Sequence, residues 1–405
     1  MAITNLREHI ALAFDGGGVR GIIPATALSA LETALGVKRL IDAPQIKVIT
    51  GTSTGAIIAA AVALGMTSAE IVSMYQEMAP IIFPPKMEIP ASWRDTLDKI
   101  NKVFSLPDNT GYVEHLREII RQRTGKADIT LGELHQQSLQ AAGKVLLITT
   151  VNVYERRTRF LKSCTTKNKA DPDSDQNWGL WEAVVASSAA PTFFPVYVRQ
   201  RFDDHGRVIK GEESYYIDGG TGSFNNPAYI AAREAVEFQC YPRETVSVLS
   251  FGTGWLDQMD FEESEQTPPD RWNILEWAAK VPLDIMMGEA ARVQSLDVLH
   301  DFVVYHSGIN KVSYDAPHSI DFRRFQIRLD RKIDLDDSSA ESLADLQRMG
   351  TELLANIRAN HYLTSENIID IAALPNTREF IEAADLKDPE GITPLWRKIM
   401  AVDCS

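Results

Sequence analysis

A serine flanked by two glycines, at the junction of an apolar strand and an apolar helix, is the feature that most constrains this fold. The segment GTSTG, centred on Ser53 between Gly51 and Gly55, follows an apolar run at residues 45–50 and precedes the all-apolar residues 56–64. A G-x-S-x-G segment between a strand and a helix is typical of a nucleophile elbow, a sharp turn that exposes the serine hydroxyl. The sequence therefore predicts that the glycines relieve crowding in the turn and that the serine is a nucleophile.

A second cluster of glycines, DGGGVRG, lies between an apolar strand at residues 9–14 and a helix at residues 22–35. Consecutive glycines leave several backbone N–H groups unblocked in one small space, and such a concavity at a helix N-terminus stabilises negative charge. This segment alone does not decide whether these N–H groups bind a phosphate or an oxyanion that develops during a reaction.

The same cluster matches G-x-G-x-x-G, the fingerprint of dinucleotide binding, through Gly16, Gly18 and Gly21. A dinucleotide-binding oxidoreductase needs an acidic side chain near the end of the second strand to hold a ribose. Asp42 precedes the second strand and Ser53 follows it. The oxidoreductase is therefore the less favoured alternative.

A serine nucleophile needs a base, and the segment YYIDGG supplies a candidate. Asp218 ends a short apolar strand, and Gly219 and Gly220 allow another backbone to approach closely. An ordinary turn is the other interpretation of this segment. The eight histidines lie mostly in polar or helical runs, and none stands in a glycine-rich setting at a strand end. We therefore favour Asp218 over a histidine as the general base.

Strands and helices alternate over the first 65 residues, which predicts an α/β fold with a parallel sheet covered by helices. Further strands are expected at residues 144–151, 159–161, 194–198 and 246–251. From about residue 338 the chain has a helical pattern, with a capping box predicted at Ser338 and Glu341. We expect one α/β domain at residues 1–335 and a helical C-terminal extension at residues 336–405.

The acidic balance of the chain excludes some classes of partner. Lysine and arginine number 41 against 55 aspartates and glutamates, a formal net charge of −14 in 405 residues. Polymeric nucleic acid is not an expected partner, because binding it usually needs a basic face. The sequence has no apolar run long enough for a spanning helix, no apolar signal segment at its start, and three widely spaced cysteines. We expect a cytoplasmic protein that meets a membrane only from the water side.

Three motifs in this order resemble those of the patatin-like phospholipase family: the glycine loop, the GTSTG elbow and the DGG at residues 218–220. Residues 186–195 (ASSAAPTFFP), residues 249–254 (LSFGTG) and the NP at residues 226–227 agree with the family as well. The resemblance covers roughly residues 9–260. It implies a three-layer α/β/α fold with a mostly parallel central sheet.

The resemblance also implies a lipid acyl hydrolase that works through a serine–aspartate dyad. Ser53 is expected to attack an ester carbonyl and Asp218 to act as general base. The amides of Gly17 and Gly18, together with that of Gly16, are expected to form the oxyanion hole. An ordinary carboxylate is a weak base, with a pKa of about 4, so the aspartate should be desolvated beside the serine.

The resemblance favours membrane phospholipid as the substrate, met by peripheral contact at the inner face of the membrane. An acylglycerol or another carboxylic ester is the alternative. Such chemistry needs no metal and no organic cofactor. Arg20 occupies the place of the family's arginine in the glycine loop, where it either fixes the loop or meets an anionic head group.

Some bacterial proteins similar to this one are effectors in anti-phage defence that cyclic oligonucleotides switch on. The layout of the chain is compatible with a cyclic nucleotide activator, although no motif identifies one. A homo-oligomer is likewise left open.

Three stretches have two interpretations each. Residues 80–109, apolar and rich in proline, form a packed connector or a cap over a lipid-sized pocket. The basic residues 156–169 form a solvated face or an anion-binding patch. The acidic residues 171–182 resemble a calcium-binding loop, but Gln176 stands where such a loop needs glycine. We therefore expect a solvated acidic loop and no metal.

Overall fold

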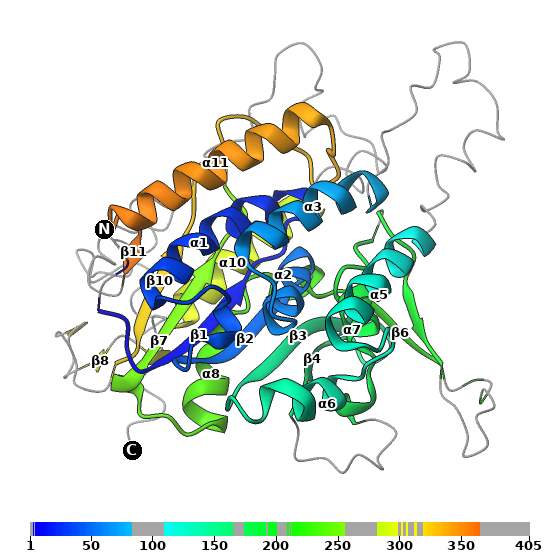
Figure 1. The fold of residues 1–405 in the computed structure, drawn as a ribbon, viewed down its shortest axis with the longest axis horizontal. Helices are drawn as coiled ribbons and strands as arrows, with labels where there is room; N and C mark the ends of the chain where they lie inside the picture. Colours follow the sequence, from blue (N-terminus) through cyan, green and yellow to red (C-terminus); the bar gives the residue numbers. More distant parts are fainter. Residues whose placement is uncertain are drawn as a thin grey trace, which may run out of the picture.

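The computed structural model describes residues 3, 5–82, 109–164, 174–191, 193–200, 209, 211, 213–255, 282–298, 301–302, 305–306, 312–313 and 319–364. Within these residues a nine-stranded sheet forms the centre of the molecule, with helices on both faces (Figure 1). The strand order is β11-β10-β7-β1-β2-β3-β6-β5, and β4 pairs with β3 outside this path. The predicted stretch at residues 80–109 lies mostly outside the described residues, which resume at Asn109.

The five central strands are parallel to one another, and the flanking strands are antiparallel. The parallel strands are β10 (Asp321–Phe325), β7 (Val246–Phe251), β1 (His9–Phe14), β2 (Ile46–Thr52) and β3 (Val145–Asn152). The flanking strands are β4 (Arg157–Lys162), β5 (Tyr197–Arg199), β6 (Ser214–Asp218) and β11 (Leu363–Thr364). A separate ribbon is formed by β8 (Tyr305–His306) and β9 (Val312–Ser313). This mixed, mostly parallel sheet confirms the predicted α/β class.

Two apolar cores lie on opposite faces of the sheet, because successive side chains of a strand point to opposite sides. On β1, Ile10, Leu12 and Phe14 join one core, whereas Ala11 and Ala13 join the other. The first core is covered by α1 (Ile22–Leu35), α2 (Thr54–Ala63), α3 (Ser68–Ile82), α5 (Thr110–Thr124), α6 (Leu131–Leu134), α7 (Leu180–Ser187) and α11 (Ala340–Arg358). The second is covered by α8 (Ala228–Arg233) and α10 (Pro282–Val298). The fold is therefore the three-layer α/β/α arrangement that was predicted.

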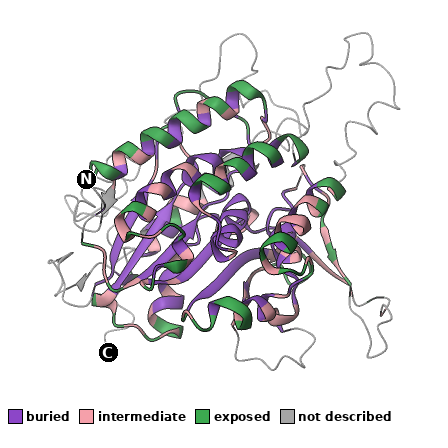
Figure 2. Cartoon of the chain, in the orientation of Figure 1, coloured by how far each residue is buried: buried purple, intermediate pink, exposed green. Residues whose placement is uncertain are grey.

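Helix α2 lies inside the molecule. All ten of its residues are buried, and Figure 2 shows the helix uniformly in the colour of buried residues, next to the equally buried central strands. Burial on every side explains why this helix has no polar face, and the prediction that it lies inside the fold is confirmed. The turn that carries Ser53 is thus held between a buried strand and a buried helix.

Two predicted boundaries were wrong. The strand expected at residues 194–198 begins at Tyr197, because the Phe194 side chain is buried beside the pocket described below. The N-cap of α11 is Ser339 and not Ser338, since the Ser339 hydroxyl accepts the backbone N–H of Ser342 at 3.2 Å. The predicted pairing of Ser338 with Glu341 is therefore shifted by one residue.

The C-terminal part of the described chain is built into the same sheet and the same core. Helix α11 packs along α1, and β11 pairs with β10 at the edge of the sheet (Figure 1). Residues 365–405, which make up the rest of the predicted helical extension, lie outside the described residues. Among the helices that the structure describes, none has both the length and the apolar character needed to cross a bilayer.

Candidate active site

Ser53 lies in a strained turn between β2 and α2. Its φ of 55° and ψ of −122° belong to a region that residues with side chains rarely adopt. The turn needs glycine at position 51, because a Cβ there would lie 2.0 Å from the carbonyl oxygen of Gly55. The sequence pattern G-x-S-x-G therefore forms the elbow that was expected of it.

Asp218 lies against this elbow. It ends β6, which pairs with β3 directly beside the end of β2. The Ser53 hydroxyl donates a hydrogen bond to the Asp218 carboxylate, whose Oδ1 also accepts the amide of Gly220 at 2.6 Å. Both side chains are buried, with exposed fractions of 7% for Ser53 and 2% for Asp218. The structure therefore brings together the nucleophile and the base that the sequence predicted.

The ASSAAP segment, at the end of α7 and just beyond it, holds both residues in place. The hydroxyl of Ser187 accepts the backbone N–H of Ser53 at 2.8 Å, and the carbonyl of Ala189 accepts the backbone N–H of Asp218 at 2.9 Å. The hydroxyls of Ser188 and Tyr112 lie 3.1 Å apart at the wall of the site. This motif therefore fixes the distance between the two functional side chains.

Burial gives Asp218 the properties of a stronger base. Desolvation raises the pKa of its carboxyl to about 7, and the hydrogen bonds from Ser53 and from the Gly220 amide oppose this rise only in part. An unperturbed aspartate has a pKa of about 4. Because base strength follows pKa, the buried carboxylate is better able to take the serine proton than an exposed one.

This raised pKa predicts the pH dependence of the enzyme. Below about pH 7 the carboxyl is increasingly protonated, and the neutral acid is too weak a base to take the serine proton, so we expect kcat/KM to fall about tenfold per pH unit. Above that value kcat/KM should reach a plateau. The measurement is the hydrolysis of the uncharged ester p-nitrophenyl butyrate between about pH 5 and about pH 9, within the range where the fold is intact by circular dichroism. A midpoint near 4 would contradict the assignment of Asp218.

The glycine loop offers two free backbone donors next to the elbow. The amides of Gly17 and Gly18 make no hydrogen bond with any described residue. The Gly16 amide corrects our prediction, because it already donates to the carbonyl of Asn225 at 3.1 Å. Gly18 has a φ of 56°, and a Cβ there would lie 2.1 Å from the carbonyl oxygen of Leu335, so only glycine fits. The oxyanion hole that the geometry offers therefore has two donors.

Backbone groups from the C-terminal part of the chain fix this loop. The amide of Val19 donates to the carbonyl of Leu335 at 2.9 Å, and the guanidinium of Arg20 donates to the carbonyl of Ile333 at 2.9 Å. Arg20 is buried, with 8% of its surface exposed. Of the two positions expected for Arg20, the structure shows the one that fixes the loop.

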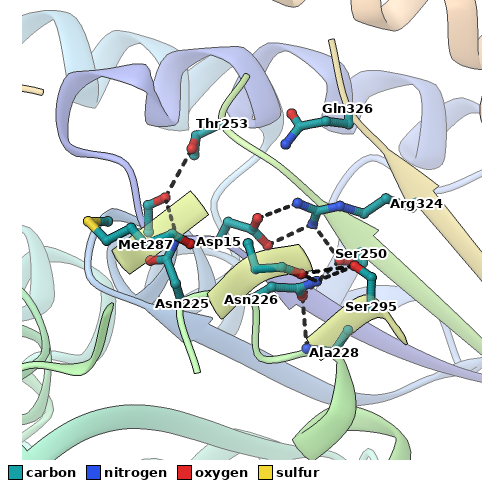
Figure 3. A network of polar contacts seen from close by, with 12 residues as sticks. Asp15, Asn225, Asn226, Ala228, Ser250, Thr253, Met287, Ser295, Arg324 and Gln326 are labelled. Atoms are coloured by element: carbon teal, nitrogen blue, oxygen red, sulfur yellow. Dashed lines mark hydrogen bonds and ion pairs between the residues drawn. The ribbon is translucent and has the colours of Figure 1, made fainter. Parts of the chain in front are cut away.

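A buried polar network, which the sequence did not predict, supports the loop from below (Figure 3). Asp15, which directly precedes the glycines, forms a two-pronged ion pair with Arg324 of β10 at 2.5 and 2.8 Å. Arg324 also donates to Ser250, Ser250 donates to Asn226, and Asn226 donates to Ser295 of α10. Two adjacent arginines in a short strand were the only sequence signal for this network.

Asn225 is a further site residue that the sequence analysis missed, because an asparagine near a proline is typical of an ordinary turn. Its Nδ2 donates to the carbonyls of Met287 and Gly16, at 3.2 and 3.5 Å (Figure 3). Its buried Oδ1 has no donor among the described residues. A Cβ on Gly16 would lie 2.3 Å from this Oδ1 and 3.1 Å from Cβ of Ser53. A hydrogen-bond acceptor is therefore available beside the nucleophile.

A mainly apolar pocket opens beside Ser53 and Asp218. Its apolar walls come from α2, α3, α10 and the segment after α7, and they include Ile57, Ala79, Ile82, Phe193, Phe194 and Met287. Its lining also includes residues with polar side chains, which are Ser53, Thr54, Tyr75, Tyr112, Ser188 and Asp218. The pocket therefore suits an ester whose acyl part is a hydrocarbon.

The described parts of the basic stretch at residues 156–169 and of the acidic stretch at residues 171–182 do not line this site. In the basic stretch, Arg157, Arg159 and Lys162 form ion pairs with Glu155, Asp175 and Glu234. Its remaining part and the start of the acidic loop, residues 165–173, lie outside the described residues. Among the residues that the structure does describe, no cluster of histidine, cysteine and acidic side chains has the arrangement of a metal site.

A serine on a strained elbow, a buried carboxylate and two free glycine amides define the class of a serine hydrolase that acts on carboxylic esters. The family model described as "Patatin-like phospholipase" matches residues 12–232, more than half of the chain. The chain therefore belongs to the patatin-like phospholipase family, and it is a lipid acyl hydrolase.

Curated relatives are similar to this chain over different shares of its length. Patatin-like protein 2 of Oryza sativa subsp. indica is 25% identical over 91% of this chain and 89% of its own length. A cGAMP-activated phospholipase of Vibrio cholerae is 25% identical over 84% of this chain and 89% of its own length. A second protein of that name, from Escherichia coli strain TW11681, is 31% identical over 55% of this chain and 54% of its own length.

Proposed function

We propose that the chain is a phospholipase of the A type, which cleaves the carboxylic esters of membrane phospholipids with Ser53 and Asp218 as a catalytic dyad. The observation that carries this proposal is the hydrogen bond from the serine hydroxyl to a buried carboxylate, next to the free amides of Gly17 and Gly18. The mainly apolar pocket at the same point supports a lipid substrate.

Acylation begins with the Ser53 hydroxyl. Asp218 takes its proton while the Ser53 oxygen attacks the ester carbonyl carbon, and the carbonyl oxygen becomes an oxyanion. The amides of Gly17 and Gly18 donate to this oxyanion, and one such donor is worth about 3–4 kcal/mol in comparable enzymes. Collapse of the intermediate breaks the ester C–O bond, and Asp218 returns the proton to the leaving lysophospholipid oxygen. The fatty acyl group is then bound to the serine.

Deacylation repeats these steps with water. Asp218 takes a proton from a water molecule, whose oxygen attacks the acyl carbon, and the second oxyanion uses the same two amides. The proton then passes from Asp218 to the Ser53 oxygen as the fatty acid leaves. In our proposal the unpartnered Oδ1 of Asn225 accepts the other hydrogen of this water and so orients it.

We assign the acyl chain of the substrate to this pocket beside the dyad. Ala79 of α3 is 2% exposed and lines the pocket, so a tryptophan in its place would fill the space that we assign to the hydrocarbon chain. We expect Ala79→Trp to lower kcat/KM for p-nitrophenyl palmitate by about tenfold or more, since several buried CH₂ groups at about 0.8 kcal/mol each would lose their site. Hydrolysis of p-nitrophenyl acetate, whose acyl group ends near the serine, should change by less than about twofold. Equal losses on both esters would contradict the assignment of the pocket.

Product analysis separates the proposed substrate from its alternatives. The full-length protein is incubated with phosphatidylcholine–phosphatidylglycerol vesicles and, in parallel, with a triacylglycerol emulsion, and the products are identified by mass spectrometry. We expect free fatty acid and lysophospholipid from the vesicles. Hydrolysis of the emulsion alone would favour an acylglycerol lipase, and hydrolysis of soluble esters alone would favour a general carboxylesterase. Release of a phosphorylated head group would contradict both the proposal and these alternatives.

We further propose that a cyclic dinucleotide activates the enzyme, and that it degrades the membrane from the cytoplasmic side in defence against phage. The two similar proteins described as cGAMP-activated phospholipases support this proposal. The test is the rate of fatty acid release from vesicles with and without cyclic GMP–AMP. An unchanged rate would contradict activation by this nucleotide and leave the hydrolytic proposal intact.

A further inference from the structure

We infer that a second ligand site, for a phosphate-bearing anion, lies at the far end of the strand and helix that hold Ser53. The existence of this site does not depend on the proposed function, but its effect on hydrolysis does. The site is a hollow of about 570 Å³ between the start of β2, the end of α2 and the chain that leads into β3. An adjoining hollow of about 610 Å³ shares Arg39, Asp42, Gly65 and Arg123 with it.

Positive charge predominates in these two hollows, although the chain as a whole is strongly acidic. The charged residues that line them are the cations Lys38, Arg39, Lys47, Arg123 and Lys144 and the carboxylates Asp42 and Glu70. Each carboxylate already binds an arginine, with distances of 2.7 Å in the Arg39–Asp42 pair and 2.8 Å in the Arg123–Glu70 pair. Three lysines are therefore left without a carboxylate partner among the described residues.

Lys144 is the most unusual of the three, because its side chain is almost completely buried, with 1% of the residue exposed. Its ammonium group donates to the carbonyls of Ala43 and Ile46, at 2.7 and 2.8 Å. An ammonium group has three donors, so one N–H is left for another acceptor. Burial disfavours the charged ammonium group and lowers the pKa of Lys144 to about 8, and the charge of Asp42 opposes this fall only in part.

The charge of Lys47 lies close enough to Lys144 to disfavour the charged form of Lys144 further. This charge contributes to the lowered pKa of Lys144, so the two ammonium groups repel one another. Lys47 lines the same hollow and forms no ion pair with a described residue. Neither lysine forms an ion pair with a described residue, and Asp42, which is already paired with Arg39, offsets their repulsion only in part. An anion bound between the two lysines would relieve this repulsion.

A phosphate or phosphodiester has the chemistry that fits this hollow. Ammonium groups bind phosphate oxygens through charge-assisted hydrogen bonds, and the N–H groups of Arg39 and Arg123 at the rim supply further donors. The volume lies within the range of small-molecule sites. Two sources offer this chemistry, a nucleotide and the head group of an anionic phospholipid.

The position of the hollow connects it to the catalytic serine. Strand β2 begins at Ile46, next to Lys47, and ends one residue before Ser53, and α2 returns from Thr54 to Ala63 at the hollow. At about 3.3 Å per strand residue, the two sites lie roughly 20 Å apart. A ligand that shifts the start of β2 or the end of α2 would therefore act on the two elements that define the strained elbow.

The test measures binding to the full-length chain in a Ser53→Ala background, so that no probe is hydrolysed. The probes are cyclic GMP–AMP and inorganic phosphate by titration calorimetry, and phosphatidylcholine vesicles with or without phosphatidylglycerol by co-sedimentation. We expect Lys47→Glu to weaken binding of the anionic probe by about tenfold or more. The matched control is Lys332→Glu, the same charge change at a half-exposed lysine outside the hollow, and it should leave binding unchanged.

Each outcome decides the inference. If Lys47→Glu weakens binding of cyclic GMP–AMP, the site binds a nucleotide. If Lys47→Glu, but not Lys332→Glu, weakens binding to phosphatidylglycerol vesicles, the site binds a lipid head group. Binding of inorganic phosphate alone, lost in Lys47→Glu, supports a free-phosphate site. No binding of any anionic probe, or binding that Lys47→Glu and Lys332→Glu change equally, would overturn the inference. The Lys47→Glu variant with Ser53 intact should keep its basal hydrolysis of p-nitrophenyl butyrate, so a failed binding site and a failed hydrolase are distinguishable.

Discussion

Replacing Ser53 with alanine is expected to lower ester turnover by about 10³-fold or more, because removal of a serine nucleophile has effects of this size or larger in comparable hydrolases. Asp218→Asn should cause a loss of similar order, since a neutral amide is far too weak a base to take the serine proton. The measurement is fatty acid release from phospholipid vesicles and from p-nitrophenyl butyrate. Several per cent of wild-type activity in Ser53→Ala would contradict the dyad.

The strained backbone at Ser53 supplies a control for folding. Alanine has the same difficulty as serine at a φ of 55°, whereas glycine adopts this conformation readily. Ser53→Gly should therefore be inactive and yet about 1 kcal/mol more stable than Ser53→Ala in urea unfolding. Loss of activity together with this order of stability would show that catalysis is lost while the elbow is intact.

The second large effect is expected at the buried ion pair below the glycine loop. Replacing Arg324 with methionine should lower the free energy of unfolding by about 3–5 kcal/mol, because it leaves the Asp15 carboxylate buried without its partner. Burial raises the pKa of Asp15 and Arg324 opposes this rise, so without the arginine the carboxyl would tend to take a proton. The hydroxyl of Ser250 would also lose its contact with Arg324.

A double variant distinguishes the ion pair from simple packing. In Asp15→Asn/Arg324→Met no charge is buried, so we expect the double variant to recover part of the stability that Arg324→Met loses. Urea unfolding of wild type, both single variants and the double variant gives the coupling between the two residues. If the losses in stability of the two single variants add up in the double variant, the charges of Asp15 and Arg324 do not interact, and the two side chains stabilise the fold only by packing.

The sequence predicted the features that depend on local pattern. The bounds of β1, α1 and β7 are those expected from apolar runs and glycines. The three short motifs were each recognisable by composition. Their convergence was implied by the family resemblance and not by strand order, since Asp218 ends β6, which is antiparallel to its neighbours. The G-x-S-x-G pattern was likewise enough to predict the strained turn at Ser53.

The supports of the site could not be predicted in this way, because they join distant parts of the chain. The partners Asp15 and Arg324 are 309 residues apart, and neither has a local pattern that points to the other. The hydrogen bond from the Gly16 amide to the carbonyl of Asn225 likewise depends on the packing of two loops. The cationic hollow depends on Lys144, and a lysine before a strand has an ordinary sequence context.

The late position of Arg324, Ile333 and Leu335 in the chain has a consequence for biosynthesis. A ribosome that has made the first two thirds of the protein has already released both reactive side chains, yet the glycine loop still lacks three of its anchors. Domains generally fold as units as they emerge from the ribosome, and this unit is complete only when β10 and the segment after it have emerged. The glycine loop of the nascent chain is therefore not fully anchored until residues 324–335 have been made.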